Sequence, residues 1–161
     1  MLVVLMGVAG VGKTTVGELV ARGLGLPFHD ADDFHPDENR RKMAAGIPLT
    51  EEDREPWLHD LARRMHDWEA EGGAVVACSA LRRRHRELLA GAGPVRFVWL
   101  DADEATIRSR LASRKGHYMP PSLLDSQVAA LEPPRSDEAV RIDAGGTLED
   151  TARAVVAALS S

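Results

Sequence analysis

The chain has 161 residues, of which 44% are hydrophobic and 28% charged, and its formal net charge is −5 at pH 7. This length suits one domain over residues 1–161, and the acidic balance disfavours nucleic acid as a partner. The one cysteine, Cys78, cannot form an internal disulfide, and no apolar run is long enough for a signal peptide or a membrane span, so we expect a cytoplasmic protein without membrane contact.

Strand and helix patterns alternate through the first half of the chain. Residues 2–6 form a continuous apolar run, typical of a parallel strand buried on both faces, and a helix up to about Leu24 is expected to follow. A short strand at 27–29 leads into the acidic segment 30–33, and a short helix is expected at 37–45. Thr50 is a suitable N-cap for a long helix, in which Pro56 predicts either a later start or a kink.

The alternation continues in the second half. Further strands are expected at 74–78, 95–100 and 140–142, and further helices at 81–90, 104–114, about 122–130, and from Leu148 to Leu159. Strands that alternate with helices predict an α/β fold, a five-stranded parallel sheet with helices on both faces. Ligands of such sheets bind beyond the carboxyl ends of the strands. This rule selects the loop after the first strand, residues 30–33, residues 79–83 and the turn after Leu100.

The segment from Gly7 to Thr14 matches the phosphate-binding pattern G-x-x-x-x-G-K-[ST] between a predicted strand and a predicted helix. Its backbone N–H groups and the helix N-terminus favour phosphate oxygens, Lys13 can reach the β- and γ-phosphates, and the Thr14 hydroxyl is a natural Mg²⁺ ligand. ATP and Mg²⁺ are therefore the predicted cofactors. The nucleotide contacts are assigned to Gly7, Ala9, Gly10, Val11, Gly12, Lys13, Thr14 and Thr15.

Other residues narrow the class of phosphate-loop protein. The only asparagine, Asn39, precedes Arg40, so the Asn-Lys-x-Asp element that reads guanine in regulatory GTPases is missing. The strand at 74–78 ends in Ser79-Ala80 without the acidic residue expected of a large ATPase. These absences and the small size favour a compact metabolite kinase.

Two carboxylates and one arginine are candidates for the acceptor side. Asp30 and Asp32 follow the second strand and point roughly the same way if the pleat continues, so one could hold Mg²⁺ through water while the other accepts a proton from an acceptor hydroxyl or orients it. A solvated acidic turn is the alternative. Arg54 is either a surface arginine or the guanidinium fork for a substrate carboxylate.

Two basic stretches and the histidines need separate interpretations. Residues 82–86 contain four arginines; Arg82, Arg83 and Arg86 are expected to divide between substrate contacts and solvent. Residues 110–121 are basic, with Gly116 and two prolines, as in a lid that closes over the transferring phosphate; an ordinary surface loop is the alternative. The six histidines and Cys78 lack the spacing of a structural zinc site.

Several segments, taken with the phosphate loop, strongly resemble those of the small gluconokinases and occur in the same order over about residues 3–143. They are residues 30–36, Asn39 with Lys42 and Met43, 46–49, 53–58, 78–81, 114–119, Ser126 with Gln127, and 131–134. This family is related to shikimate kinase and the nucleoside-monophosphate kinases. The resemblance implies a three-layer P-loop kinase fold with a mobile lid, here at about 112–125, and a homodimer as a candidate assembly.

The resemblance also implies an activity, the transfer of phosphate from ATP to the 6-hydroxyl of D-gluconate. Lys13, Asp32 and Arg114 would be catalytic, Thr14 and Asp30 would lie at the metal, and Arg110 would belong to the lid or the adenine side. The implied gluconate contacts are Asp32, His35, Arg54, Ser79, Arg82, Arg83 and His117. A shikimate-kinase-like enzyme is the nearest alternative, although its glycine triplet is replaced here by Ser79-Ala80-Leu81; a nucleoside-monophosphate kinase and a non-catalytic nucleotide-binding regulator are weaker ones.

Overall fold

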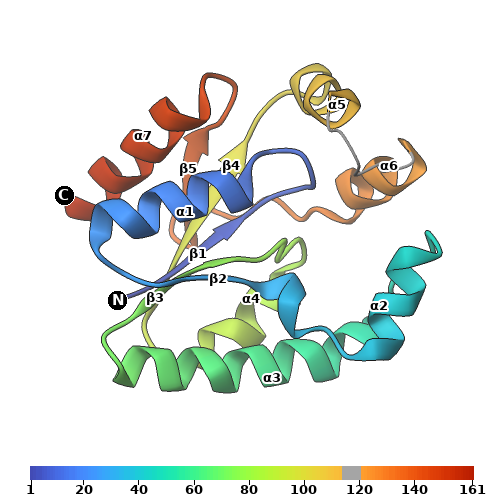
Figure 1. Cartoon of the computed structure of the whole chain (residues 1–161), viewed down its shortest axis with the longest axis horizontal. Helices are drawn as coiled ribbons and strands as arrows, with labels where there is room; N and C mark the ends of the chain where they lie inside the picture. Colours follow the sequence, from blue (N-terminus) through green and yellow to red (C-terminus); the bar gives the residue numbers. More distant parts are fainter. Residues whose placement is uncertain (114–120) are drawn as a thin grey trace.

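The computed structural model describes residues 1–113 and 121–161, apart from the side chain of Pro121. Its five strands form one parallel sheet in the order β2-β3-β1-β4-β5, which confirms the predicted α/β class (Figure 1). Each strand lies within about two residues of its expected position. The strands are β1 (Leu2–Met6), β2 (Phe28–Asp30), β3 (Ala74–Ala77), β4 (Val95–Asp101) and β5 (Ala139–Asp143).

Helices connect the strands and cover the sheet on both faces (Figure 1). They are α1 (Lys13–Leu24), the short 3-10 helix η1 (Ala31–Phe34), α2 (Asp37–Ala44), α3 (Glu51–Ala70), α4 (Arg83–Ala90), α5 (Glu104–Ala112), α6 (Pro121–Ala130) and α7 (Leu148–Ser160). None of the helices within residues 1–113 and 121–161 is long and apolar enough to cross a membrane.

The alternation of side chains along β1 divides the core into two layers. Leu2, Val4 and Met6 face α3 and α4, where they pack in one cluster with residues such as Leu61. Val3 and Leu5 face the opposite side, and their cluster includes buried residues of α1 and α7. All five residues of β1 are fully buried, as expected for the central strand of a parallel sheet covered by helices on both faces. The arrangement is the predicted three-layer fold.

Helix α3 begins where its sequence signal predicts. The Thr50 hydroxyl accepts from the Asp53 N–H, and the Asp53 carboxylate accepts from the Thr50 N–H, which together make a capping box. The helix runs on through Pro56 to Ala70. Of the two alternatives expected for Pro56, the later start was therefore wrong, because the reciprocal cap satisfies the first turn and outweighs the hydrogen bond that the proline cannot donate; a kink at Pro56 stays a prediction.

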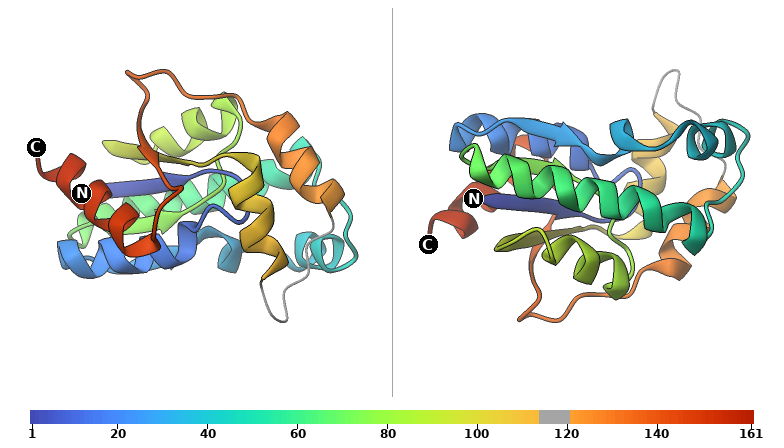
Figure 2. Two further views of the ribbon diagram at one scale, coloured as in Figure 1. Left: turned by 90° about the horizontal axis from the view of Figure 1, so that it is seen from above. Right: turned by 90° about the horizontal axis from the view of Figure 1, so that it is seen from below.

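All five strands run in the same direction, so their carboxyl ends lie at one edge of the sheet. Figures 1 and 2 show α2 and α6 at this edge, far from both termini of the chain. The phosphate loop after β1, η1 after β2, and the residues after β3 meet in the space between these two helices. The fold thus brings together the first three of the four segments that the sequence selected.

Candidate active site

The phosphate loop connects β1 to α1 and adopts a conformation that depends on glycine. Gly10 and Gly12 have φ angles of 86° and 103°, in the left-handed region where other residues are strained. The Lys13 ammonium turns back over the loop and donates to the carbonyl oxygens of Gly7 at 2.8 Å and Val8 at 3.0 Å. The backbone is therefore curled as a phosphate cradle, and the lysine already lies at its mouth.

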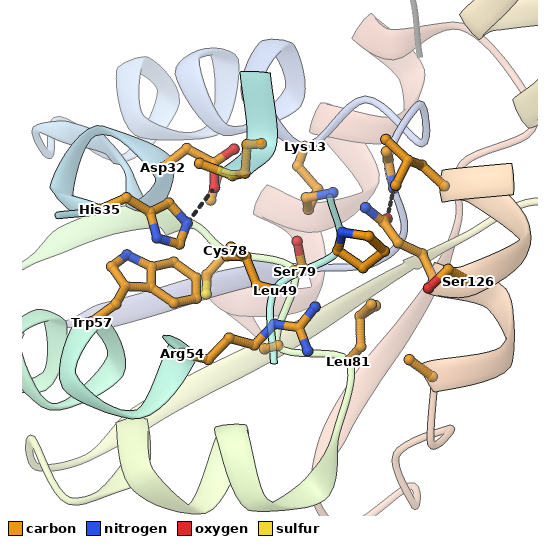
Figure 3. A pocket seen from close by; sticks show the side chains of 18 of the residues that line it. Lys13, Asp32, His35, Leu49, Arg54, Trp57, Cys78, Ser79, Leu81 and Ser126 are labelled. Atoms are coloured by element: carbon orange, nitrogen blue, oxygen red, sulfur yellow. Dashed lines mark hydrogen bonds and ion pairs between the residues drawn. The ribbon is translucent and has the colours of Figure 1, made fainter. Parts of the chain in front are cut away.

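A cavity of about 610 Å³ adjoins this loop. Its walls come from the phosphate loop, η1, the end of α2 and the segment 45–49 after it, the start of α3, the residues after β3, and α6. The predicted site residues on its lining are Ala9, Gly10, Gly12, Lys13, Thr14, Asp30, Asp32, His35, Arg54 and Ser79. Figure 3 shows Lys13 and Arg54 pointing into the cavity from opposite sides, so the phosphate loop and the candidate carboxylate-binding group face one common space.

The two predicted metal ligands are neighbours. The Thr14 hydroxyl donates to Asp30 Oδ2 at 3.1 Å, and Asp30 Oδ1 accepts from the Asp32 N–H at 3.0 Å. In residues 1–113 and 121–161, no cluster of three or more His, Cys, Asp or Glu could hold a metal ion by itself. Mg²⁺ commonly takes one or two protein oxygens and completes its shell with water and substrate phosphates. The Thr14–Asp30 pair therefore fits a magnesium ion that is bound together with a nucleotide.

The environments of Asp30 and Asp32 shift their pKa values in opposite directions. Burial raises the pKa of Asp30, and the neighbouring Asp32 carboxylate adds to this effect. For Asp32, the hydrogen bond from His35 lowers the pKa more than burial raises it, and the charges of Lys13 and Arg40 lower it further. The Asp32 side chain is 70% exposed and lines the cavity, so the lowered pKa favours an ionised carboxylate that an acceptor hydroxyl can reach.

Arg54 projects from the first turns of α3 into the cavity, and its side chain is 26% exposed. Its Nη1 lies 3.4 Å from Glu51 Oε1, and the same carboxylate group accepts from His85 Nε2 at 3.0 Å. Burial lowers the pKa of His85, which favours a neutral ring there. Glu51 therefore orients the guanidinium while one edge of it still faces the cavity (Figure 3).

The arginines around the start of α4 differ in position. Arg82 and Arg83 are 45% and 55% exposed and lie outside the cavity lining. Arg86 is buried, so the expectation that it would reach substrate or solvent was wrong. Its Nε pairs with Glu138 at 2.5 Å, and its Nη1 donates to the carbonyl oxygen of Ala80 at 2.8 Å. Ala80 lines the cavity and has a positive φ of 45°, which is strained for a residue other than glycine. The hydrogen bond from Arg86 to its carbonyl oxygen therefore stabilises a strained turn in the cavity wall.

The lid residues are described only in part. Arg110, on α5, donates to the carbonyl oxygen of Val11 at 3.1 Å and to that of Ala144 at 2.6 Å, so it joins the phosphate loop to the turn after β5. Val11 itself is fully buried. Arg114 and His117 lie outside the described residues, as does the central part of the predicted lid.

Gly7 and Thr15 complete the predicted nucleotide contacts, and neither is on the cavity lining. The Gly7 N–H donates to the Ser79 carbonyl oxygen at 3.2 Å, which connects the phosphate loop to the residues after β3. Thr15 is exposed on α1.

Sequence reasoning missed three residues of the site. Gln127 Oε1 accepts from the Ala9 N–H of the phosphate loop, Asn39 donates to His35, and Trp57, expected only as a core residue, stacks on the His35 ring. Asn39 and Gln127 are the only asparagine and the only glutamine in the chain. That rarity, and the place of both residues in the segments that resemble gluconokinases, are the signals that could have directed attention to them.

The fold and the site together define a P-loop kinase of the shikimate kinase type. A sequence model of the family described as shikimate kinase matches residues 9–137. A gluconokinase of Gluconobacter oxydans is 48% identical over 143 residues, which cover 85% of this chain and 78% of that protein. The thermosensitive gluconokinase of Escherichia coli K12 is 46% identical over 144 residues, which cover 87% of this chain and 77% of that protein.

A solved structure agrees with these relatives. The crystal structure of a gluconokinase from Sinorhizobium meliloti superimposes with a TM-score of 0.91 at 41% sequence identity, and the match covers 99% of this chain and 91% of that one. The chain belongs to the gluconokinase family, as its sequence segments predicted.

Proposed function

We propose that this protein transfers the γ-phosphoryl group of ATP to the 6-hydroxyl of D-gluconate, in the presence of Mg²⁺. The observation that carries the proposal is the single cavity lined by Lys13, Asp32 and Arg54, since it offers a phosphate site, a proton acceptor and a carboxylate site in one space. The names of the relatives, which are gluconokinases, supply the identity of the acceptor.

The donor half of the reaction uses the phosphate loop. Backbone N–H groups of the loop bind the phosphates, and Lys13 exchanges its contacts with the Gly7 and Val8 carbonyl oxygens for phosphate oxygens. Thr14 and Asp30 would hold Mg²⁺, which neutralises negative charge on the phosphates when bound. Because phosphoryl transfer has a loose transition state, positioning and charge neutralisation contribute more to the rate than base strength does.

The acceptor half uses the opposite wall. Arg54 binds the gluconate carboxylate through charge-assisted hydrogen bonds, which fixes one end of an extended sugar acid. Asp32 accepts a hydrogen bond from the terminal hydroxyl and takes its proton as this oxygen bonds to the γ-phosphorus and the bond from that phosphorus to the leaving ADP oxygen breaks. Ser79 lines the cavity and is available for a polyol hydroxyl. The binding of the carboxylate at a distance from the reacting hydroxyl selects for both the charge and the length of the substrate.

Other assignments complete the proposal. Arg110 and Arg114 act on the nucleotide side, and His117 contacts gluconate from a lid at about 112–125 that excludes water. Arg82 and Arg83 reach gluconate only if that wall of the cavity moves, because neither lines it here. His35 remains among the proposed substrate-site residues. We also propose one kinase domain over residues 1–161, a cytoplasmic location and a homodimer.

A coupled assay of ADP release tests the proposal. The purified protein is given ATP and Mg²⁺ with gluconate, shikimate, AMP or no acceptor. Release that depends on gluconate, with formation of 6-phosphogluconate, is the expected result. Release with shikimate or AMP instead would identify another kinase, and nucleotide binding without release would indicate a regulator.

A further inference from the structure

We propose that His35 is a positioning residue, which holds the Asp32 carboxylate toward the acceptor hydroxyl, and that Asn39 fixes the tautomer in which it does so. The inference deepens the proposed function and rests on it. It departs from the sequence expectation that His35 binds gluconate directly.

The burial of His35 leaves little of it for a substrate. Its side chain is only 2% exposed, whereas the side chain of Asp32, its partner, is 70% exposed. Asn39 behind it is also buried. His35 therefore borders the cavity with very little of its surface, and the carboxylate is the part of the pair that reaches the substrate space.

The contacts of Asn39 determine which ring nitrogen carries the proton. Asn39 Nδ2 lies 3.0 Å from the backbone carbonyl oxygen of Asp53 and 3.1 Å from His35 Nδ1. A carbonyl oxygen only accepts, so the atom beside it must be the donating amide nitrogen. The same NH₂ group then donates its second hydrogen to His35 Nδ1, which must accept.

The consequence appears on the other side of the ring. When Nδ1 accepts, the proton of a neutral imidazole is on Nε2. His35 Nε2 faces Asp32 Oδ1 at 3.5 Å, a contact drawn in Figure 3. The Nε2–H thus donates toward the carboxylate in the tautomer that Asn39 selects. Such catalytic contacts are often long in the absence of substrate and shorten when it binds.

Trp57 prevents the ring from turning. Its indole stacks on the His35 imidazole with ring centres 3.9 Å apart and planes inclined by 21°. The indole Nε1–H donates to the Ala31 carbonyl oxygen at 2.9 Å, one residue before Asp32. The imidazole is therefore fixed by a hydrogen bond at Nδ1 and by a stack on its face, and η1 is attached to the same tryptophan.

Other charged groups around Asp32 do not replace this contact. Lys13 and Arg40 favour the ionised carboxylate through their charge, and Asp30 faces it from the preceding strand. The Arg40 guanidinium is directed to backbone carbonyl oxygens of Asp33 and His35, at 2.6 Å and 3.2 Å. His35 is thus the directional donor that selects one rotamer of Asp32, and its loss should lower kcat more than it changes KM.

Two substitutions separate positioning from mere packing. His35→Gln places an amide nitrogen near the position of Nε2 and can still donate to Asp32, whereas His35→Asn reaches only the position of Nδ1 and can satisfy only Asn39. For His35→Asn we expect kcat to fall on the order of tenfold to a hundredfold, with the KM of gluconate and of ATP within about twofold. The fall for His35→Gln should be at least about fivefold smaller.

His59→Asn, an exposed histidine on α3, is the control that should keep the wild-type kcat. Equal losses in the two His35 variants, or a smaller loss in His35→Asn, would overturn the positioning role. A rise in the KM of gluconate with kcat unchanged would overturn it as well, because that result means direct substrate binding.

A measurement on the unmodified protein tests the tautomer without using activity. In the ¹⁵N spectrum of the histidine side chains at about pH 8, we expect His35 to carry its proton on Nε2, with the signal assigned by its loss in His35→Gln. A proton on Nδ1 would overturn the inference. If the wild-type protein does not phosphorylate gluconate, the proposed function fails, and the spectrum still shows which ring nitrogen of His35 carries the proton. If the wild-type protein is active and the variants contradict the expectation, only the positioning role fails.

Discussion

Gln127 on α6 accepts a hydrogen bond from the backbone N–H of Ala9 in the phosphate loop at 2.7 Å, across 118 residues of sequence. A loop N–H is thereby satisfied by a side chain of α6, a helix that begins within the range predicted for the lid. The contact therefore attaches α6 directly to the phosphate loop.

Replacement of Gln127 by methionine should weaken nucleotide binding. The substitution keeps the size of the side chain and removes the acceptor, and a hydrogen bond of this kind contributes about 1 kcal/mol, so the KM of ATP should rise about fivefold. The KM of gluconate should stay within about twofold. Steady-state kinetics with each substrate varied in turn measures both values.

Asp125→Ala on the same helix is the control for Gln127→Met. Asp125 pairs with Arg108 at an exposed position and has no contact with the phosphate loop, so the KM of ATP should not change. An unchanged KM of ATP in Gln127→Met would show that the loop holds its conformation without this acceptor.

Lys13→Ala should reduce kcat more than Asp32→Asn does. The lysine neutralises charge on the transferring group, whereas the carboxylate assists a proton transfer that contributes less in a loose transition state. We expect losses on the order of a thousandfold for Lys13→Ala and a hundredfold for Asp32→Asn, measured as kcat at saturating substrates. Asp33→Asn, outside the cavity lining, should stay near the wild type. Near-normal turnover of Lys13→Ala would contradict the assignment of the phosphate loop.

Arg54→Ala should weaken gluconate binding and leave ATP binding unchanged. The loss of a charge-assisted hydrogen-bond pair predicts a rise of about tenfold to a hundredfold in the KM of gluconate. For Arg54→Lys, the KM of gluconate should lie between those of the wild type and Arg54→Ala, because an ammonium group keeps the charge but loses the two-pronged geometry of the guanidinium. Arg63→Ala, on the same helix with a side chain 78% exposed, is the matched control. Weaker ATP binding with normal gluconate binding would rule out the carboxylate role.

Local signals predicted much of the fold. The apolar run of β1, the phosphate loop and the N-cap of α3 at Thr50 each depend on neighbouring residues, and each formed where the sequence indicated. Interactions between distant segments could not be predicted in the same way. Whether Arg86 on the short helix α4 faces solvent depends on where residues 132–138 return to it, and the sequence of the helix does not contain that information.

The residues of the candidate site also fall into a predicted and an unpredicted group. The predicted positions of Lys13 and Asp32 on one cavity followed from the rule that ligands bind at the carboxyl ends of strands, whereas Arg54 was proposed because a guanidinium group suits a substrate carboxylate. The structure brings all three together. The donors and acceptors behind them, Asn39 and Gln127, were not predicted, because a side-chain amide bonds to whatever the tertiary structure places beside it.

The cap of α3 makes a pH-dependent contribution to stability. Asp53 Oδ2 accepts from Lys42 Nζ at 2.7 Å and from the Thr50 N–H at 2.9 Å; the Lys42 hydrogen bond in particular lowers the pKa of Asp53 from 3.8 to about 2. A carboxyl group whose pKa is depressed in the folded state stabilises that state above its unfolded pKa. This stabilisation is lost as the pH falls through the folded value.

Asp53→Asn should therefore lower the free energy of unfolding by a constant amount between about pH 7 and pH 5. The difference from the wild type should shrink below about pH 4 and be smallest near pH 2, as measured by urea unfolding at each pH. The other carboxyl groups titrate in both proteins and cancel in this difference. In a Lys42→Met background the pH-dependent part should be smaller, because the main cause of the shift is gone. A difference that stays constant down to pH 2 would mean that Asp53 titrates alike in the folded and unfolded chains.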